Sequence, residues 1–142
     1  MNSNNKYPNI EKCNPSFCIS GKIMKCNRIV AKIFRKYLMP YNITDSQLSI
    51  LFVITKKKEI TSKKISDMLC MDKSTISRNL RRLIEKKYIS KKGGFYLSIT
   101  DHGKQLLEEV IPEWEKAMFE TRQIIGNEGE NSLNILLTQL IN

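Results

Sequence analysis

Residues 72–92 combine short hydroxyl side chains with cations at helical spacing, a set of groups suited to binding an anionic polymer. At about 100° per residue, the apolar side chains of this segment share one helical face, namely Ile76, Leu80, Leu83 and Ile84. The opposite face, with Arg81 at its edge, carries Ser74, Thr75, Arg78, Arg82 and Glu85. Arginine can pair bidentately with guanine, and hydroxyls can bond phosphates or base edges. The alternative is an ordinary surface helix whose arginines are only solvated.

The side chains that we expect to contact DNA lie on this helix and on the segments before and after it. They are Ser62, Lys63, Lys64, Lys73, Ser74, Thr75, Ser77, Arg78, Arg81, Arg82, Lys91 and Lys92.

The charge of the chain is concentrated around these residues. The formal net charge is +10, and positions 56–92 hold 13 Lys or Arg against 4 Asp or Glu. Positions 101–142 hold only 3 Lys or Arg against 8 Asp or Glu. A local positive field attracts a phosphate backbone at long range. A solvated basic surface without a partner is the alternative interpretation.

The elements that must position these groups form a recognisable pattern. Thr61 or Ser62 begins a short helix whose apolar face is Ile65, Met68 and Leu69. Asp72 caps the helix of residues 73–87. Strands at about 88–92 and 95–99 follow, joined by a Gly-Gly pair that suits a two-residue hairpin turn. The pattern predicts a mainly α fold with a small β-hairpin wing, a winged helix-turn-helix at about residues 44–100.

Longer helices flank this module. Residues 1–15 are polar and are expected to form a flexible arm, and residues 16–39 form a first long helix that ends at Pro40. A capping box, Thr44-Asp45-Ser46-Gln47, opens a second helix to about position 56. Thr100 caps a helix in which Pro112 should cause a kink or a break.

Gly126 and Gly129 bracket a turn before a last helix at about 130–141. The terminal helices carry more apolar surface than a small module can cover. We therefore interpret residues 16–39 and 101–142 as dimerisation helices within a single protomer of residues 16–142.

At this point the chain resembles the multiple-antibiotic-resistance regulator (MarR) family. The resemblance rests on Thr44-Asp45-Ser46-Gln47-Leu48, on Asp72-Lys73-Ser74-Thr75-Ile76-Ser77-Arg78, and on Leu97-Ser98-Ile99-Thr100-Asp101-His102-Gly103-Lys104. It implies a homodimer that binds a pseudo-palindromic operator in double-stranded DNA, with two reading helices in successive major grooves. It also implies a transcription repressor, released by a small aromatic ligand or by thiol oxidation. One departure is the wing, which lacks the Asp-x-Arg pair usual in the family.

Two kinds of switch are compatible with the sequence. Cys18 lies at the start of the first long helix, where the helix dipole favours a reactive thiolate, and Cys13 on the arm is its candidate partner. The alternative is that Cys18 and Cys26 are small buried hydrophobes, and Cys70 is expected to be a packing residue. A ligand pocket would use Tyr37, Phe52, Trp114 and Met118, unless these side chains are simply core.

Other function classes find little support. The chain has a single histidine, His102, and shows no nucleophile motif, Gly-rich phosphate loop or clustered metal ligands, so we expect no enzyme activity, cofactor or metal. The N-terminus lacks an apolar leader and the longest apolar run is Ile50–Ile54, which predicts a cytoplasmic protein without a membrane anchor. A non-specific architectural DNA-binding protein remains the alternative function.

Overall fold

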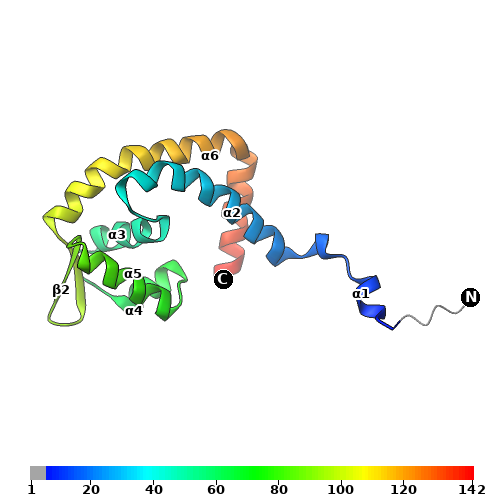
Figure 1. Cartoon of the computed structure of the whole chain (residues 1–142), viewed down its shortest axis with the longest axis horizontal. Helices are drawn as coiled ribbons and strands as arrows, with labels where there is room; N and C mark the ends of the chain where they lie inside the picture. The colour runs from blue at the N-terminus through cyan, green and yellow to red at the C-terminus, as the bar shows by residue number, and fades with distance from the viewer. Residues whose placement is uncertain (1–5) are drawn as a thin grey trace, which may run out of the picture.

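The computed structural model describes residues 6–142 (Figure 1). Residues 1–5 of the expected arm lie outside the described residues. The chain is mainly helical, with one small sheet. In order, its elements are α1 (Pro8–Lys12), η1 (Pro15–Phe17), α2 (Ile19–Leu38), η2 (Met39–Tyr41), α3 (Asp45–Lys57), β1 (Ile60–Thr61), α4 (Ser62–Leu69), α5 (Lys73–Glu85), β2 (Ile89–Lys92), β3 (Tyr96–Ile99) and α6 (Asp101–Ile141). The predicted winged helix-turn-helix class is confirmed.

Side-chain caps begin the helices where the sequence predicts them. The Thr44 hydroxyl accepts from the Gln47 amide at 3.2 Å, and the Gln47 side chain accepts from the Thr44 amide at 3.2 Å, which completes the capping box of α3. Asp72 caps α5 and Thr100 caps α6 in the same local manner. Each cap satisfies amides that have no partner within the helix.

Helix α3 lies at the centre of the core. Its side chains Leu48, Ile50, Leu51 and Ile54 are fully buried, because α2, α4, α5 and the sheet surround it. Helix α6 runs along α2 above it (Figure 1). On α4, Ile65 is buried as predicted. Met68 is not, since its side chain lies on the solvent side at 47% exposure.

The sheet has a third strand that the sequence analysis missed. Strand β1 pairs antiparallel with β3, which also pairs with β2, so the strand order is β1-β3-β2. Ile60 lies opposite Leu97, and both side chains are buried. This pairing attaches the wing to the segment just before α4, so the hairpin and the helix-turn-helix form one unit.

The wing turn is longer than predicted. Lys92 pairs with Tyr96, which leaves Gly93, Gly94 and Phe95 in the loop instead of two glycines. Both glycines have positive φ, 58° and 75°, a backbone region that glycine occupies without strain. The predicted first residue of the second strand, Phe95, is therefore a loop residue at the tip.

Helix α6 does not break at Pro112. The only non-helical backbone inside it is at Gly126, with φ 65° and ψ −179°, so the chain bends there (Figure 1). Proline keeps a helical φ, whereas a positive φ ends the regular backbone. Across the bend, Arg122 and Glu130 form an ion pair at 3.1 Å. The predicted turn is confirmed at Gly126, while Gly129 lies in the helical segment that follows.

The N-terminal segment differs from the predicted arm. Residues 8–12 form the short helix α1, and a 3₁₀ turn precedes α2, which begins at Ile19 and not near position 16. In Figure 1 this segment extends away from the rest of the chain.

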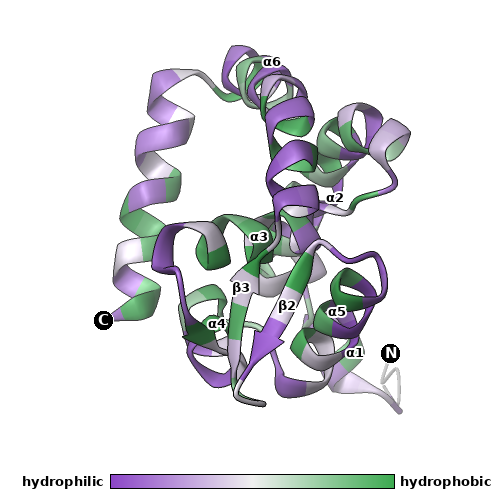
Figure 2. Ribbon diagram, turned by 90° about the vertical axis from the view of Figure 1, so that its left-hand side faces the viewer, coloured by the Kyte–Doolittle hydropathy of each residue, from purple (hydrophilic) through white to green (hydrophobic). Residues whose placement is uncertain are grey.

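Helix α2 and the last part of α6 carry apolar side chains that nothing within residues 6–142 covers. On α2, Ile19 is 72% exposed and Ile29 is 54% exposed. Every residue from 131 to 142 is exposed, including Leu133, Leu137 and Leu140, and Figure 2 shows this segment standing apart from the first part of α6. None of the helices formed by residues 6–142 has the length and hydropathy needed to cross a membrane.

Candidate nucleic-acid interface

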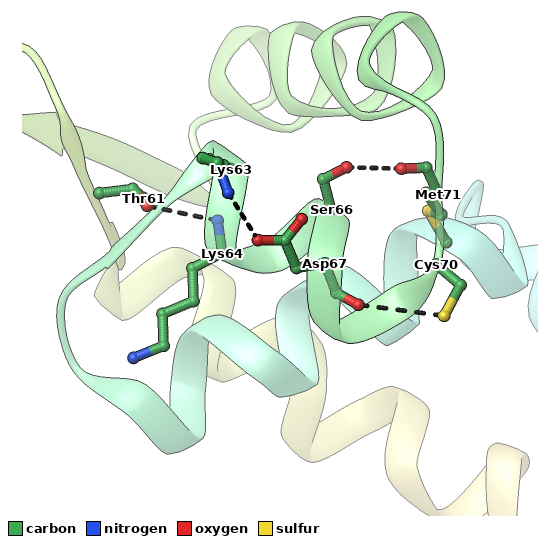
Figure 3. A network of polar contacts seen from close by, with 7 residues as sticks. All are labelled: Thr61, Lys63, Lys64, Ser66, Asp67, Cys70 and Met71. Atoms are coloured by element: carbon green, nitrogen blue, oxygen red, sulfur yellow. Dashed lines mark hydrogen bonds and ion pairs between the residues drawn. The ribbon is translucent and has the colours of Figure 1, made fainter. Parts of the chain in front are cut away.

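Local hydrogen bonds hold α4 and the turn that follows it (Figure 3). The Thr61 hydroxyl accepts from the Lys64 amide at 3.3 Å and so begins α4. At the other end, the Ser66 hydroxyl donates to the Met71 carbonyl at 2.5 Å, and Cys70 adopts a left-handed φ of 51° that ends the helix. The turn between α4 and α5 therefore has a defined shape set by its own residues.

Asp72 organises the first turn of α5. Its carboxylate accepts from the Thr75 amide at 2.8 Å and from the hydroxyls of Ser74 and Thr75 at 2.6 Å each. These hydrogen bonds, those from the Ser74 and Thr75 hydroxyls foremost, hold the pKa of Asp72 well below its usual range. Both hydroxyl protons that we expected to face DNA are thus directed to Asp72.

The exposed side of α5 carries two parallel rows of side chains. The apolar side is buried as predicted, with Ile76, Leu80 and Leu83 in the core and Ile84 half-buried. Residues four apart on a helix lie above one another. One row is therefore Lys73, Ser77 and Arg81, and the next is Ser74, Arg78 and Arg82.

A hollow of about 920 Å³ separates the first row from the wing. We call it the α5–wing hollow. Six of the expected DNA contacts line it, namely Ser62, Lys63, Lys73, Ser77, Arg81 and Lys91. Its floor includes Ile76, Leu80 and Leu97, and Glu85 is the acid in its lining. The structure thus gathers cations from α4, α5 and the wing around one concave surface.

The other expected contacts lie outside this hollow. Lys64, Ser74, Arg78, Arg82 and Lys92 are exposed, and Thr75 is half-buried. Lys63, although it lines the hollow, forms an ion pair with Asp67 at 3.0 Å (Figure 3). Such exposed pairs within a helix are weak, so Lys63 remains available to a phosphate.

The two wing lysines face opposite ways. Lys91 lies opposite Leu97, which is buried, and Lys92 lies opposite Tyr96, which is exposed. Paired residues of an antiparallel ladder point to the same side of the sheet. Lys91 therefore faces the hollow, and Lys92 faces outward.

Sequence reasoning missed Phe95. This residue lines the hollow together with Gly94, and its side chain is 76% exposed. The sequence analysis assigned Phe95 to a strand, where an exposed aromatic side chain is ordinary. The signal that identifies it is an aromatic residue directly after a Gly-Gly pair.

Contacts at the start of α6 fix the base of the wing. The Thr100 hydroxyl donates to the Lys87 carbonyl at 2.7 Å and accepts from the Gly103 amide at 3.0 Å. Gly103 lies so close to the chain that a Cβ there would stand 2.2 Å from the Tyr88 carbonyl oxygen. His102, the single histidine, stacks on the Tyr88 ring with 4.9 Å between ring centroids. The wing therefore has a fixed orientation relative to α6.

The proposed pocket residues do not surround one cavity in the single chain. Phe52 and Trp114 pack edge to face with 5.3 Å between ring centroids, and Met118 packs against the core. The Tyr37 hydroxyl instead donates to Glu120 at 2.6 Å, next to a second hollow of about 870 Å³. The Lys36 ammonium binds the same Glu120 oxygen at 2.6 Å, and these two hydrogen bonds, that from Lys36 foremost, lower the pKa of Glu120.

The cysteines are not packing residues in this chain. Cys13, Cys18, Cys26 and Cys70 are all exposed free thiols, so the expectations of buried thiols at Cys18, Cys26 and Cys70 are wrong for the single chain. Cys18 caps α2, with its sulfur accepting from the Gly21 amide at 3.3 Å. Across residues 6–142, no group of three or more His, Cys, Asp or Glu side chains is placed to hold a metal ion.

Fold and surface together define a winged helix-turn-helix protein with a cationic, concave reading face. Comparison with known proteins gives the family of this module. The model of the MarR family matches residues 43–92, so this segment of the chain is a MarR-family domain.

Its relatives are helix-turn-helix regulators. The uncharacterized HTH-type transcriptional regulator YwaE of Bacillus subtilis (strain 168) is 31% identical over 106 residues, which are 70% of this chain and 60% of YwaE. The matched region thus spans less than two thirds of that relative.

Solved structures share the fold. NadR in complex with 4-hydroxyphenylacetate superposes with a TM-score of 0.74 at 22% identity, covering 87% of this chain and 94% of NadR. BpsR of Bordetella bronchiseptica, whose DNA binding is regulated by 6-hydroxynicotinic acid, superposes with a TM-score of 0.77 at 18% identity, covering 90% and 97% of the two chains.

Proposed function

We propose that this protein is a dimeric, sequence-specific DNA-binding transcription repressor that inserts α5 into the major groove. The observation that carries the proposal is the α5–wing hollow, where Lys73, Arg81 and Lys91 surround a concave surface from two sides. A helix and a hairpin separated by a cationic hollow match a duplex, in which one sugar–phosphate strand lies between a major and a minor groove.

The two rows on α5 then have different roles. The row of Lys73, Ser77 and Arg81 borders the hollow, so it contacts the sugar–phosphate strand. The row containing Arg78 and Arg82 lies on the outer side of α5, where it meets base edges in the major groove. Arginine is suited to that role because its guanidinium pairs bidentately with guanine.

A second copy of the chain supplies the other half of the site. The exposed apolar side chains of α2 and of residues 131–142 need a partner of the same kind, and a symmetric dimer satisfies both copies at once. Two reading helices about 34–36 Å apart would contact successive major grooves on one face of DNA. The operator is therefore a pseudo-palindrome.

Release from DNA is proposed to follow a small aromatic ligand or oxidation of Cys18. The ligand route is supported by two structural neighbours, NadR, solved in complex with 4-hydroxyphenylacetate, and BpsR, whose DNA binding is regulated by 6-hydroxynicotinic acid. Its candidate residues are Tyr37, Phe52, Trp114 and Met118. The oxidation route is supported by the exposed Cys18 thiol at the start of α2, with Cys13 on the segment before it.

Selection of bound fragments from random duplex DNA tests the function. A shared pseudo-palindromic motif, bound at least about a thousandfold tighter than random duplex, is the expected result. A similar affinity for every duplex would favour the alternative, a non-specific architectural protein, which the cationic surface alone would allow.

The same assay separates the release signals. Operator affinity is measured with mild peroxide, for the wild type and Cys18→Ser, and with aromatic acids. Loss of affinity after peroxide in the wild type only would establish the redox route. Unchanged affinity after peroxide, with loss on adding an aromatic acid, would establish the ligand route.

A further inference from the structure

Phe95 places an apolar ring at the tip of the wing, in a strongly positive setting. Its side chain is 76% exposed, and no acidic residue occurs between Lys86 and Tyr96. The ring lines the α5–wing hollow opposite Lys73 and Arg81 of α5. An exposed aromatic side chain that lines the same hollow as cations is suited to a partner that is both apolar and anionic.

The backbone of the tip is narrow. Gly93 and Gly94 carry no side chains, and their positive φ values of 58° and 75° fold the loop tightly. Phe95 is therefore the only bulky group in the loop. A minor groove about 6 Å wide admits a single side chain of this kind but not a broad loop.

The lysines on either side of the tip fit the walls of such a groove. Lys91 faces the hollow and Lys92 faces outward, so they point to opposite sides of the hairpin. A hairpin that enters a minor groove has a phosphate strand on each side. Each strand would then have its own lysine, with Phe95 at the tip of the hairpin.

Building on the proposed function, we propose that Phe95 is a minor-groove wedge that enters the duplex beside each major-groove half-site. Apolar side chains that insert into the minor groove partly unstack a base step and kink the duplex. Pyrimidine–purine steps kink most easily, so the wing selects a deformable step and does not read a hydrogen-bond pattern. Phe95 would thus select DNA through the deformability of a base step, whereas an arginine selects it through the negative potential of the minor groove.

The test uses the full chain and duplexes obtained by selection from random DNA. Phe95→Ala should bind the selected duplex about tenfold more weakly, since it loses an apolar contact. Phe95→Leu should keep most of the affinity. The salt dependence should stay the same for both variants because no charge is removed. Energy transfer between dyes at the two duplex ends should show a smaller bend with Phe95→Ala.

Two controls make the outcome specific. Lys92→Ala should flatten the salt dependence by about one unit of slope while keeping the bend. Replacing the flexible step of the duplex with an A-tract should weaken the wild type but not weaken Phe95→Ala further. Equal binding and bending by wild type and Phe95→Ala would overturn the wedge alone. A wild-type chain that selects no duplex would overturn both the wedge and the proposed function.

Discussion

At the scale of single residues, the reading face depends on where each side chain stands around α5. Arg78 and Arg81 are only three positions apart, yet Arg81 lines the hollow and Arg78 does not. Within residues 6–142, neither guanidinium has an acidic partner in an ion pair. Both are thus available to a partner, and in the proposed function their different placement gives them different targets.

This difference predicts two distinct mutant phenotypes. Arg78→Ala should cost about 1–3 kcal/mol at the operator and relax the preference at one base pair in each half-site. Arg81→Ala should weaken operator and random DNA equally and lower the salt slope by about one unit. Equilibrium binding at several salt concentrations measures both. Equal weakening of all duplexes by Arg78→Ala would instead make it a phosphate contact.

Asp72 should make the stability of α5 depend on pH. Folding lowers the pKa of the Asp72 carboxyl. The stability that Asp72 contributes is therefore fully present above its unfolded-state pKa, about 4, and is lost as the pH falls through its folded-state pKa. Asp72→Ala should therefore melt at a lower temperature than the wild type at pH 7, and the gap should narrow below about pH 4. Thermal unfolding followed by circular dichroism tests this. A difference in melting temperature that stays the same at every pH would show that the charge of Asp72 does not contribute to stability.

At the scale of elements, the orientation of the wing depends on the contacts made at its base. Strand β1 pairs with β3 on one side, and Thr100 joins the end of β3 to the carbonyl of Lys87. Ser90 and Ser98 also contact across the hairpin, with 3.2 Å between their hydroxyl oxygens. The relative position of α5 and the wing tip follows from these contacts, and so does the shape of the hollow.

Gly103 is the most sensitive point of this arrangement. Gly103→Ala would put a Cβ 2.2 Å from the Tyr88 carbonyl oxygen and 2.9 Å from Ile99, so the backbone must shift. A loss of about 1–3 kcal/mol in the free energy of unfolding is expected. Gly21→Ala is the matched control, because its Cβ meets Cys18 at an ordinary 3.5 Å and alanine favours helix. Chemical denaturation should show a loss for the first variant and no loss for the second.

At the scale of the whole molecule, the proposed DNA contacts and most of the exposed apolar side chains occupy two different regions. The first region is α4, α5 and the wing, and the second is α2, which is also basic, with the end of α6. A dimer formed through the second region leaves the first free, with both reading faces available to one duplex. Figure 2 shows the hydrophobic stretches of the terminal segment and the hydrophilic end of β2 in one view.

The dimer can be tested without truncating the chain. Leu137 and Leu140 lie on one face of the last segment and are 54% and 68% exposed. Replacing both with Glu should give a folded monomer with weak operator binding, since each half-site alone supplies only part of the affinity. Asn131→Glu with Thr138→Glu adds the same charge on the opposite, polar face and should remain a dimer. Sedimentation showing the same dimer for both double variants would contradict the proposed interface.

The sequence by itself determined the helices from α2 to α5, the cap of α6 and the amphipathic pattern of α5. These features depend on neighbours three or four positions apart, as in the Thr44–Gln47 capping box and the apolar face of α5. The cationic module and the family resemblance were equally readable, because charge and motif are local properties.

Only the tertiary structure decided how these elements combine. Strand β1 exists because Ile60 meets Leu97, a contact between distant positions that no local pattern encodes. The helix that continues unbroken through Pro112 was likewise decided only in the fold, since proline predicts a kink or a break at that position. The α5–wing hollow, the opposite facing of Lys91 and Lys92, and the exposed ring of Phe95 all follow from strand register. Register is set by which segments pair in space, so these features appear only once the chain is folded.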